Sequence, residues 1–220
     1  MNSPIIQLLV LAGIAVFLIL RLRSVLGTRE GFEKPQVSDS SRAAQRKRPD
    51  LEVIEGGPDR DIIDHVPEGS DAAKALASMK RADPDFGVSD FLGGARGAYE
   101  WILMAFENGD LSEVRPFLSD DVYEAFAGVI EERNRQGLTV HATFVGLSEI
   151  TLKDAEFDET SREAELTVKF VGEITSVVRD NAGDIVEGSP SEIKRQRDVW
   201  TFARKMGADD PNWVLVATGE

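Results

Sequence analysis

The run GGARG, residues 93–97, contains the residue types that most directly suggest chemistry in this sequence, because glycine-rich loops bind phosphate. A phosphate-binding loop lies between a strand and a helix, so that backbone N–H groups point at the anion. Here the preceding residues, 79–90, are mostly polar and contain a proline, and no Lys-Ser or Lys-Thr pair follows the glycines. The sequence therefore favours a helix over a phosphate site at this position.

Apolar residues in this region recur at intervals of three and four, which is typical of one face of a helix. They are Phe91, Ala95, Ala98, Tyr99, Ile102, Leu103 and Phe106. The helix is expected to begin at Asp90 and to end at Asn108-Gly109. Because glycine in a helix costs about 1 kcal/mol relative to alanine, Gly93, Gly94 and Gly97 predict the close approach of another backbone.

Acid–base catalysis would need a pair of titratable side chains, for which His141 and Asp198 are candidates. His141 lies alone near the start of an expected strand and is interpreted as a surface or structural residue. Asp198 precedes Trp200 and is expected to be partly buried in an ion pair. The partners considered for this pair are Arg195, Arg197 and Arg204. The run DDP at residues 209–211 is typical of a turn.

The composition restricts the possible functions further. The chain has 220 residues, no cysteine and two histidines, which excludes thiolate nucleophiles and argues against a histidine-rich metal site. Spacing indicates no acid–base partner for any candidate, so we predict no catalytic residue, no cofactor and no metal site. The net charge of −14 argues against nucleic acid as a partner, because affinity for phosphate backbones comes largely from lysine and arginine.

An apolar run at residues 4–20, interrupted only by Gln7, predicts a membrane-spanning helix at residues 4–22 that would contact lipid. Residues 21–50 behind it carry eight Lys/Arg against four Asp/Glu. The basic residues that follow the span most closely are Arg21, Arg23 and Arg29. By the positive-inside rule, the N-terminus is expected outside and the rest of the chain on the cytoplasmic side.

Residues 23–70 show no sustained helix or strand period and are rich in charge, serine, glycine and proline, which predicts a disordered cytoplasmic linker. Its basic run at residues 42–48 either contacts anionic headgroups or is simply solvated, and both interpretations stay open. A short helix is expected at residues 71–81 after Ser70. Its small apolar residues favour docking on the domain over binding to a membrane surface.

The domain is expected to span residues 71–220, with helices first and strands afterwards. Asp110 and Glu113 predict a capping box and a short helix, and a longer helix is expected from Ser119 to Gln136. The period then changes to two. Strands are expected at residues 139–157 (one or two), 163–170, 195–205 and 212–218, with a hairpin turning at 180–184. This order predicts an α+β domain with its helices packed on one concave face of a curved antiparallel sheet.

Three blocks of the sequence, residues 83–126, 174–205 and 210–218, carry a family resemblance. Together they resemble the Tim44-like domain family of inner-membrane translocase adaptors, over about residues 71–220. The resemblance implies a fold similar to that of nuclear transport factor two, with a large apolar pocket and a location beside a membrane. It also implies adaptor activity, since the mitochondrial member connects the protein-import channel with the seventy-kilodalton heat-shock chaperone and contacts cardiolipin-containing membrane.

The chain departs from the mitochondrial pattern before the domain. The long charged helical region found there is replaced by the predicted span and linker, so chaperone docking does not follow from the resemblance. The N-terminus also lacks the arginine-rich amphipathic character of a transit peptide. Both features favour a bacterial, single-span, membrane-anchored member of the family, in the inner membrane with its N-terminus in the periplasm.

Trp101 falls between the apolar positions of its helix and is expected to be exposed, as anchors at partner interfaces often are. With Phe91 and Tyr99 on the same helix, it is predicted to bind a partner. We therefore predict a non-enzymatic adaptor that recruits protein clients, chaperone or translocation and insertion machinery to the cytoplasmic face of the inner membrane. The alternative is a membrane-tethered domain that binds lipid or a small apolar ligand, and a small pocket enzyme ranks third.

Overall fold

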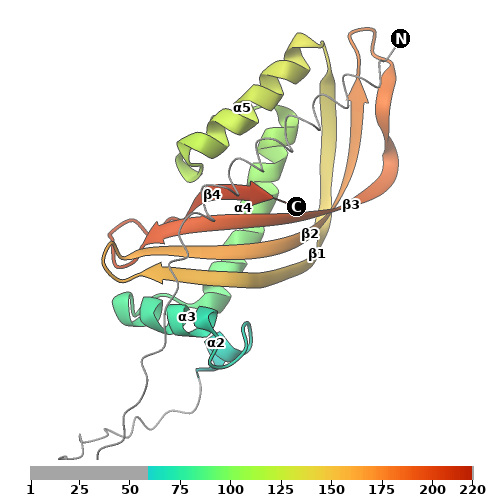
Figure 1. The fold of residues 1–220 in the computed structure, drawn as a ribbon. Coiled ribbons are helices and arrows are strands. Elements are labelled where there is room, and N and C mark those ends of the chain that lie inside the picture. The colour runs from blue at the N-terminus through green and yellow to red at the C-terminus, as the bar shows by residue number, and fades with distance from the viewer. Residues whose placement is uncertain (1–58, 220) are drawn as a thin grey trace, which may run out of the picture. The chain divides into compact units, whose positions relative to one another are not determined.

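The computed structural model describes residues 59–219 (Figure 1). The predicted span at residues 4–22, its flanking basic residues Arg21, Arg23 and Arg29, and the linker up to residue 58 lie outside the described residues. Among residues 59–219, no helix is both long and apolar enough to cross a membrane.

The described chain places its helices before its strands, which confirms the predicted α+β class (Figure 1). The helices are α2 (Arg60–Ile63), α3 (Asp71–Ala82), α4 (Val88–Asn108) and α5 (Asp120–Arg135), with a short 3₁₀ helix at Arg115–Phe117. The strands are β1 (Thr139–Asp158), β2 (Glu163–Arg179), β3 (Ile185–Lys205) and β4 (Val214–Gly219). They form one antiparallel sheet in the order β1-β2-β3-β4. Whether this sheet matches the nuclear-transport-factor-two cone stays a prediction.

Local sequence signals account for most of these boundaries. The Ser70 and Ser119 hydroxyls cap α3 and α5 by accepting hydrogen bonds from backbone N–H groups of their first turns. Helix α4 ends at Gly109, which adopts a left-handed conformation, as expected. The helix predicted after Asp110 is wrong: the carboxylate of Asp110 accepts a hydrogen bond from the Ser112 N–H in a turn, and only the 3₁₀ segment follows.

Residues 59–70, predicted to belong to the disordered linker, are instead part of the domain. Helix α2 and the turn after it bury Ile62 and Val66. The carboxylate of Asp61 accepts hydrogen bonds from the first two backbone N–H groups of α4, at 2.8 and 2.9 Å. Two buried apolar residues and one capping carboxylate form too short a segment to show a period, which is why the linker was predicted to continue to residue 70.

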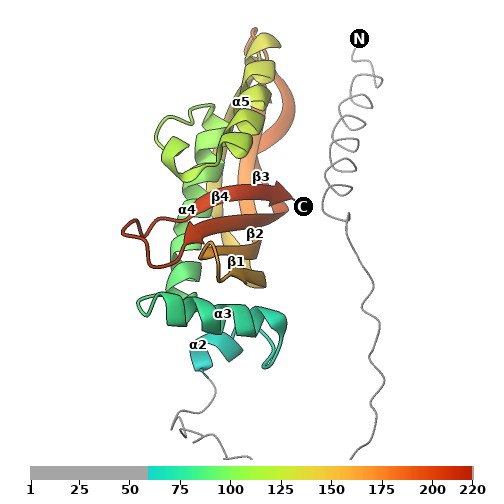
Figure 2. The same ribbon diagram turned by 60° about the vertical axis from the view of Figure 1, so that its left-hand side comes forward.

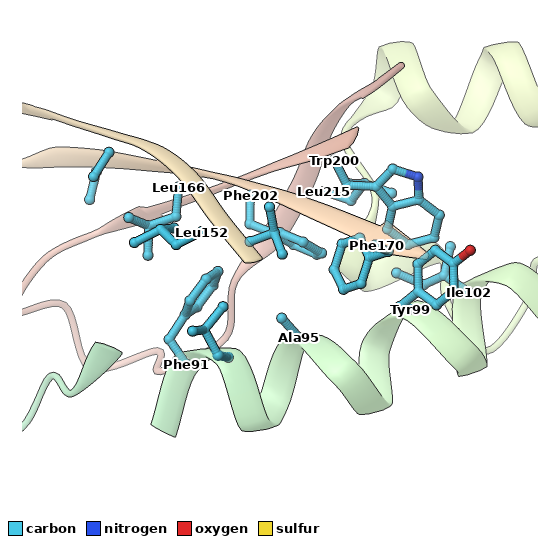
Figure 3. Packing of buried hydrophobic residues seen from close by; sticks show 14 of the residues in the cluster. Phe91, Ala95, Tyr99, Ile102, Leu152, Leu166, Phe170, Trp200, Phe202 and Leu215 are labelled. Carbon is cyan, nitrogen blue, oxygen red and sulfur yellow. The ribbon is translucent and has the colours of Figure 1, made fainter. Parts of the chain in front are cut away.

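Helix α4 runs across one side of the sheet, with α3 near its first turn and α5 near its last (Figure 2). The Tyr99 ring on α4 stacks on Phe170 of β2, with 4.5 Å between the ring centroids, and packs against Trp200 of β3 at 4.8 Å (Figure 3). A Cβ at Gly172 would lie 2.7 Å from the Tyr99 hydroxyl oxygen, so β2 needs glycine there. Helix α3 packs against β1 with Leu76 fully buried, as expected for docking on the domain.

The close backbone approach predicted for the glycines of α4 is wrong. Gly93, Gly94 and Gly97 are exposed, and among residues 59–219 a Cβ added at any of them would meet no heavy atom within 4 Å outside its own stretch of helix. These glycines lie off the stripe that faces the sheet, so the periodicity that identified the helix does not place them against a neighbouring element. Part of the α4 surface is therefore bare backbone.

Residues 139–157, predicted to form one or two strands, form the single strand β1. Its pairing with β2 is interrupted by register shifts between Phe144 and Gly146, between Leu147 and Glu149, and between Leu152 and Asp154. Such bulges bend a strand without ending it. The bends let β1 to β3 curve along their length (Figure 1).

Candidate functional site

Within residues 59–219, one face of α4 is left uncovered and forms the floor of a groove. Gly94, Gly97, Ala98 and Trp101 follow one another at positions i, i+3, i+4 and i+7 and so share a face of the helix. They line a cavity of about 480 Å³ whose lining is mainly apolar. Because two of these residues are glycines, an occupant of the cavity could approach the helix backbone closely.

The walls of this cavity come from segments far apart in the sequence. Phe86 precedes α4, whereas Pro211 and Trp213 belong to the loop between β3 and β4. The Trp213 ring centroid lies 4.8 Å from that of Phe91 and 5.9 Å from that of Phe86. We call the cavity the α4 groove and define it by Phe86, Phe91, Gly94, Gly97, Ala98, Trp101, Phe117, Pro211 and Trp213. The sequence predicted Phe91 and Trp101 of this groove but not Phe86, Pro211 or Trp213. The local signal for these walls was a tryptophan directly after a proline-containing turn.

Trp101 is the predicted site residue that the structure leaves accessible. Its side chain is 41% exposed and packs against Phe117, with 5.3 Å between the ring centroids. Tyr99 is fully buried and belongs to the core, so its assignment to a partner-binding surface is wrong. Phe91 is also buried, at 7% exposure, and lines the groove in contact with Trp213. That Trp101 binds a partner stays a prediction.

The charges at the groove are mainly acidic. Asp85 and Asp90 line it, and its one arginine, Arg204, is paired with Asp83 at 2.6 Å. Residues 59–219 as a whole carry seventeen Lys/Arg against thirty-two Asp/Glu, a balance of −15. The field at the groove therefore favours an occupant with positive charge beside its apolar part.

Asp198 is not in the arginine ion pair that the sequence predicted. Its carboxylate accepts hydrogen bonds from the Tyr99 hydroxyl at 2.5 Å and from the Gln196 amide at 2.9 Å. Burial and the adjacent Asp198 carboxylate raise the pKa of Tyr99 well above its usual value, so the phenol keeps its proton. Neither Tyr99 nor Asp198 lines the α4 groove. The pair holds α4 to β3, and the arginine prediction failed because the true partner is 99 residues away.

The other candidates for chemistry are spread over the domain. His141 is exposed on β1, and residues 209–211 lie in the turn between β3 and β4, as expected. Arg195 pairs with Glu173 at 3.0 Å rather than with Asp198. In the part of the chain that the structure describes, no three His, Asp or Glu side chains are grouped closely enough to hold a metal ion.

The carboxyl group of Glu107, near the end of α4, is partly buried and lies 4.0 Å from the Arg133 guanidinium. Burial raises its pKa, and this outweighs the lowering effect of Arg133 and Lys194. A raised pKa means that ionisation opposes folding, so stability is lost as the pH rises through that pKa. We expect Glu107→Gln to raise the melting temperature near neutral pH by on the order of 2 °C, and the gain to shrink in acid as the native carboxyl becomes neutral.

Thermal denaturation of the two chains, followed by circular dichroism from neutral to acidic pH, measures this difference. Glu100→Gln is the matched control, because Glu100 is exposed on the same helix. If Glu107→Gln instead melts below the native chain at neutral pH, the attraction of Arg133 outweighs the cost of burial and the expectation is wrong.

The helices, the four-stranded antiparallel sheet and the open groove define a small α+β domain with an accessible apolar cavity. The family model described as "Tim44-like domain" matches residues 72–220, and the chain belongs to this family. The resemblance carried by the sequence is thereby confirmed for the family, and the bacterial single-span type stays a prediction.

Two curated relatives are named as subunits of a mitochondrial translocase. The chain is 23% identical over 152 residues to human "Mitochondrial import inner membrane translocase subunit TIM44", a match that covers 69% of this chain and 33% of that protein. It is 22% identical over 198 residues to TIM44-1 of Arabidopsis thaliana, covering 84% of this chain and 40% of that protein. The chain thus matches only about a third of the length of the human relative.

Among solved structures, the intermembrane space region of the chloroplast protein ARC6 is similar over 56% of this chain and 88% of that chain. The sequence identity is 11% and the TM-score is 0.37. This likeness is too weak to support a functional comparison.

Proposed function

We propose that this chain is a membrane-anchored, non-enzymatic adaptor whose α4 groove binds an apolar segment of a client protein. The observation that carries the proposal is the open, aromatic-walled groove with Trp101 exposed at its edge. Exposed apolar surface rimmed by polar residues is typical of protein interfaces. An enzyme would instead place a reactive pair inside its pocket, whereas the Tyr99 and Asp198 pair lies outside the lining.

The proposed occupant is an apolar segment flanked by lysine or arginine. Apolar side chains would cover the floor at Gly94 and Gly97 and contact Trp213. Basic flanks would lie near Asp85 and Asp90 at the rim. The net negative charge of the domain would speed the encounter with such a segment and disfavour acidic competitors.

The proposed location is a bacterial inner membrane, with the domain on its cytoplasmic face. The names of the relatives, as inner-membrane translocase subunits, support a role in protein transport. The predicted span at residues 4–22, followed by Arg21, Arg23 and Arg29, supports the topology. Clients would be membrane-protein chains, a chaperone, or translocation and insertion machinery working at that surface.

A second candidate function is the binding of a lipid chain or a small apolar ligand in the same groove. The observation that favours it is the mainly apolar lining of a cavity of about 480 Å³, a volume in the range of small-molecule sites. The groove is open along bare helix backbone, which suits a polypeptide better than an acyl chain that must be shielded from water.

In-cell photocrosslinking tests the proposal. A photoreactive amino acid replaces Trp101 in the full-length, membrane-bound chain, and adducts are identified by mass spectrometry. The matched control carries the same group at Gly93, which is exposed on α4 but does not line the groove. We expect protein adducts that depend on position 101. If the adducts contain only lipid, the adaptor proposal is wrong, and the second candidate, binding of a lipid chain or small apolar ligand, takes its place.

A further inference from the structure

A largely buried ion pair lies beside the wall of the α4 groove that carries Trp213. The Nη2 group of Arg204, at the end of β3, lies 2.6 Å from Oδ2 of Asp83 in the segment between α3 and α4. Their side chains are only 11% and 14% exposed, and the two residues are 121 positions apart. We propose that this pair, the Asp83–Arg204 clasp, positions Trp213 and thereby sets the width of the groove. This proposal rests on the function proposed above for the groove and adds a role for the ion pair in positioning Trp213.

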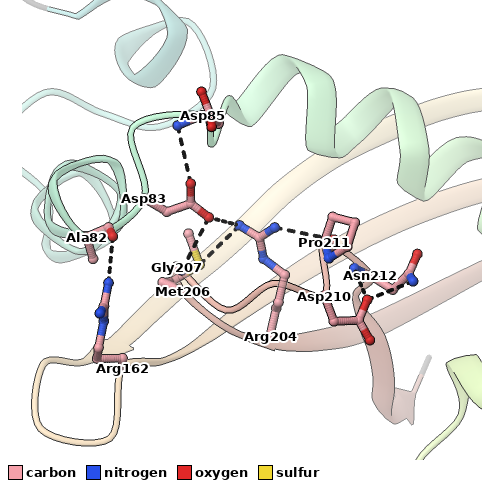
Figure 4. Close-up of polar contacts among 10 residues, drawn as sticks. All are labelled: Ala82, Asp83, Asp85, Arg162, Arg204, Met206, Gly207, Asp210, Pro211 and Asn212. Atoms are coloured by element: carbon pink, nitrogen blue, oxygen red, sulfur yellow. Dashed lines mark hydrogen bonds and ion pairs between the residues drawn. The ribbon is translucent and has the colours of Figure 1, made fainter.

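Arg204 connects the clasp to the β3–β4 loop. Its Nη1 group donates a hydrogen bond to the backbone carbonyl of Pro211 at 3.3 Å (Figure 4). Its guanidinium carbon lies over the Trp213 ring, 5.1 Å from the ring centroid. Both contacts fix the loop residues that form one wall, because a planar guanidinium holds several partners in one geometry.

Asp83 connects the clasp to the other side of the same wall. Its Oδ1 accepts a hydrogen bond from the Asp85 N–H at 3.2 Å, directly before Phe86 (Figure 4). Its Oδ2 also accepts a weaker hydrogen bond from the Gly207 N–H at 3.4 Å. One carboxylate therefore ties the segment that carries Phe86 to the start of the loop that carries Trp213.

The features of the clasp suit a role in positioning Trp213 better than a role in stabilising the fold. The Nε–H of Arg204 is buried and has no hydrogen-bond partner among the described residues. A buried ion pair with an unsatisfied donor contributes less to folding than an apolar pair of similar size would. Such pairs can nevertheless be retained for specificity, since their geometry allows few alternatives. Here the geometry that they fix is that of Trp213 against Phe86 and Phe91.

The test uses the purified full-length chain and two variants of the clasp. Asp83→Asn keeps the shape and removes the charge, and Arg204→Lys keeps the charge and removes the planar fork. The binding probe is a fluorescein-labelled synthetic amphipathic peptide of leucine, alanine and lysine. Hydrogen exchange of residues 206–213, measured by mass spectrometry, reports the loop without any ligand. Glu173→Gln is the control, because it breaks the Arg195 ion pair, which lies away from the groove lining.

We expect both clasp variants to bind the peptide at least about tenfold more weakly and to exchange faster at residues 206–213, with unchanged exchange in β2. If residues 206–213 of both variants exchange hydrogen at the rate of the native chain, the proposal that the ion pair positions this loop is wrong. Faster exchange throughout the domain would also overturn it, because the pair would then serve only stability. If the native chain does not bind the peptide, the proposed occupant is wrong, and the loop exchange alone still decides whether the clasp holds the wall.

Discussion

Gly97→Leu is expected to weaken client binding strongly while making the domain more stable. A Cβ at position 97 would meet no heavy atom within 4 Å outside its own stretch of helix, so leucine is expected to fit there and to occupy the floor of the α4 groove where the client would lie. Leucine is also a better helix former than glycine by roughly 0.8 kcal/mol, so the melting temperature should rise by about 2 °C. We expect the affinity for a client identified by crosslinking to fall at least tenfold, which corresponds to about 1.4 kcal/mol.

The control for this prediction lies on the same helix. Gly93 is exposed and has open space around it, but it does not line the groove. Gly93→Leu should therefore raise the melting temperature equally and leave binding unchanged. Denaturation curves and titration with the purified client measure both quantities. Native affinity in Gly97→Leu would show that clients bind elsewhere, and a lower melting temperature would show that the floor is not open.

Gly97→Leu is expected to raise stability and lower client affinity because the groove floor is a helix surface that contains glycine. Glycine in a helix lowers stability, and its usual compensation is a packed neighbour. At Gly94 and Gly97 that neighbour is absent from residues 59–219, whereas Gly172 of β2 has one in the Tyr99 hydroxyl. The open space at Gly94 and Gly97 is consistent with the proposed use of the groove as a binding interface, whereas Gly93, which is equally open, does not line the groove.

Local patterns in the sequence predicted the elements of this fold well. The stripe from Phe91 to Phe106 predicted α4, and the serine caps predicted α3 and α5. The turn at residues 180–184 is a hairpin in the structure, closed by a hydrogen bond from the Asp180 N–H to the Asp184 carbonyl at 3.0 Å. These features depend on neighbours in the sequence, so their physics is readable from spacing alone.

The candidate site was only partly predictable, because its geometry depends on distant contacts. The apolar periodicity of α4 correctly predicted that Trp101 is exposed, because exposure depends on which face of one helix a residue occupies. The same periodicity gave no information on Trp213, which reaches α4 from the far end of the chain. It also could not separate Tyr99, buried under the sheet, from a surface aromatic residue. No spacing rule connects Asp83 with Arg204 or Tyr99 with Asp198.

Phe170→Ala is expected to cause the largest loss of stability in the domain, about 3–5 kcal/mol. Phe170 is fully buried in the middle of β2 and contacts the rings of Tyr99, Trp200 and Phe202. Removing its ring leaves a cavity between α4 and the sheet that these neighbours cannot fill without leaving their own contacts. Since whole domains are stable by only about 5–15 kcal/mol, much of the total is lost, and urea denaturation of the full-length chain measures it.

Phe157→Ala separates this cavity effect from the loss of any phenylalanine, because Phe157 is only partly buried near the end of β1. Its truncation should cost clearly less than that of Phe170, since nearby solvent fills the vacated space. The comparison also bears on function: α4 carries the groove on one face and rests on Phe170 through the other. Phe170→Ala should therefore weaken client binding only in proportion to the unfolded fraction. A binding loss larger than that fraction would mean that the core shapes the groove directly.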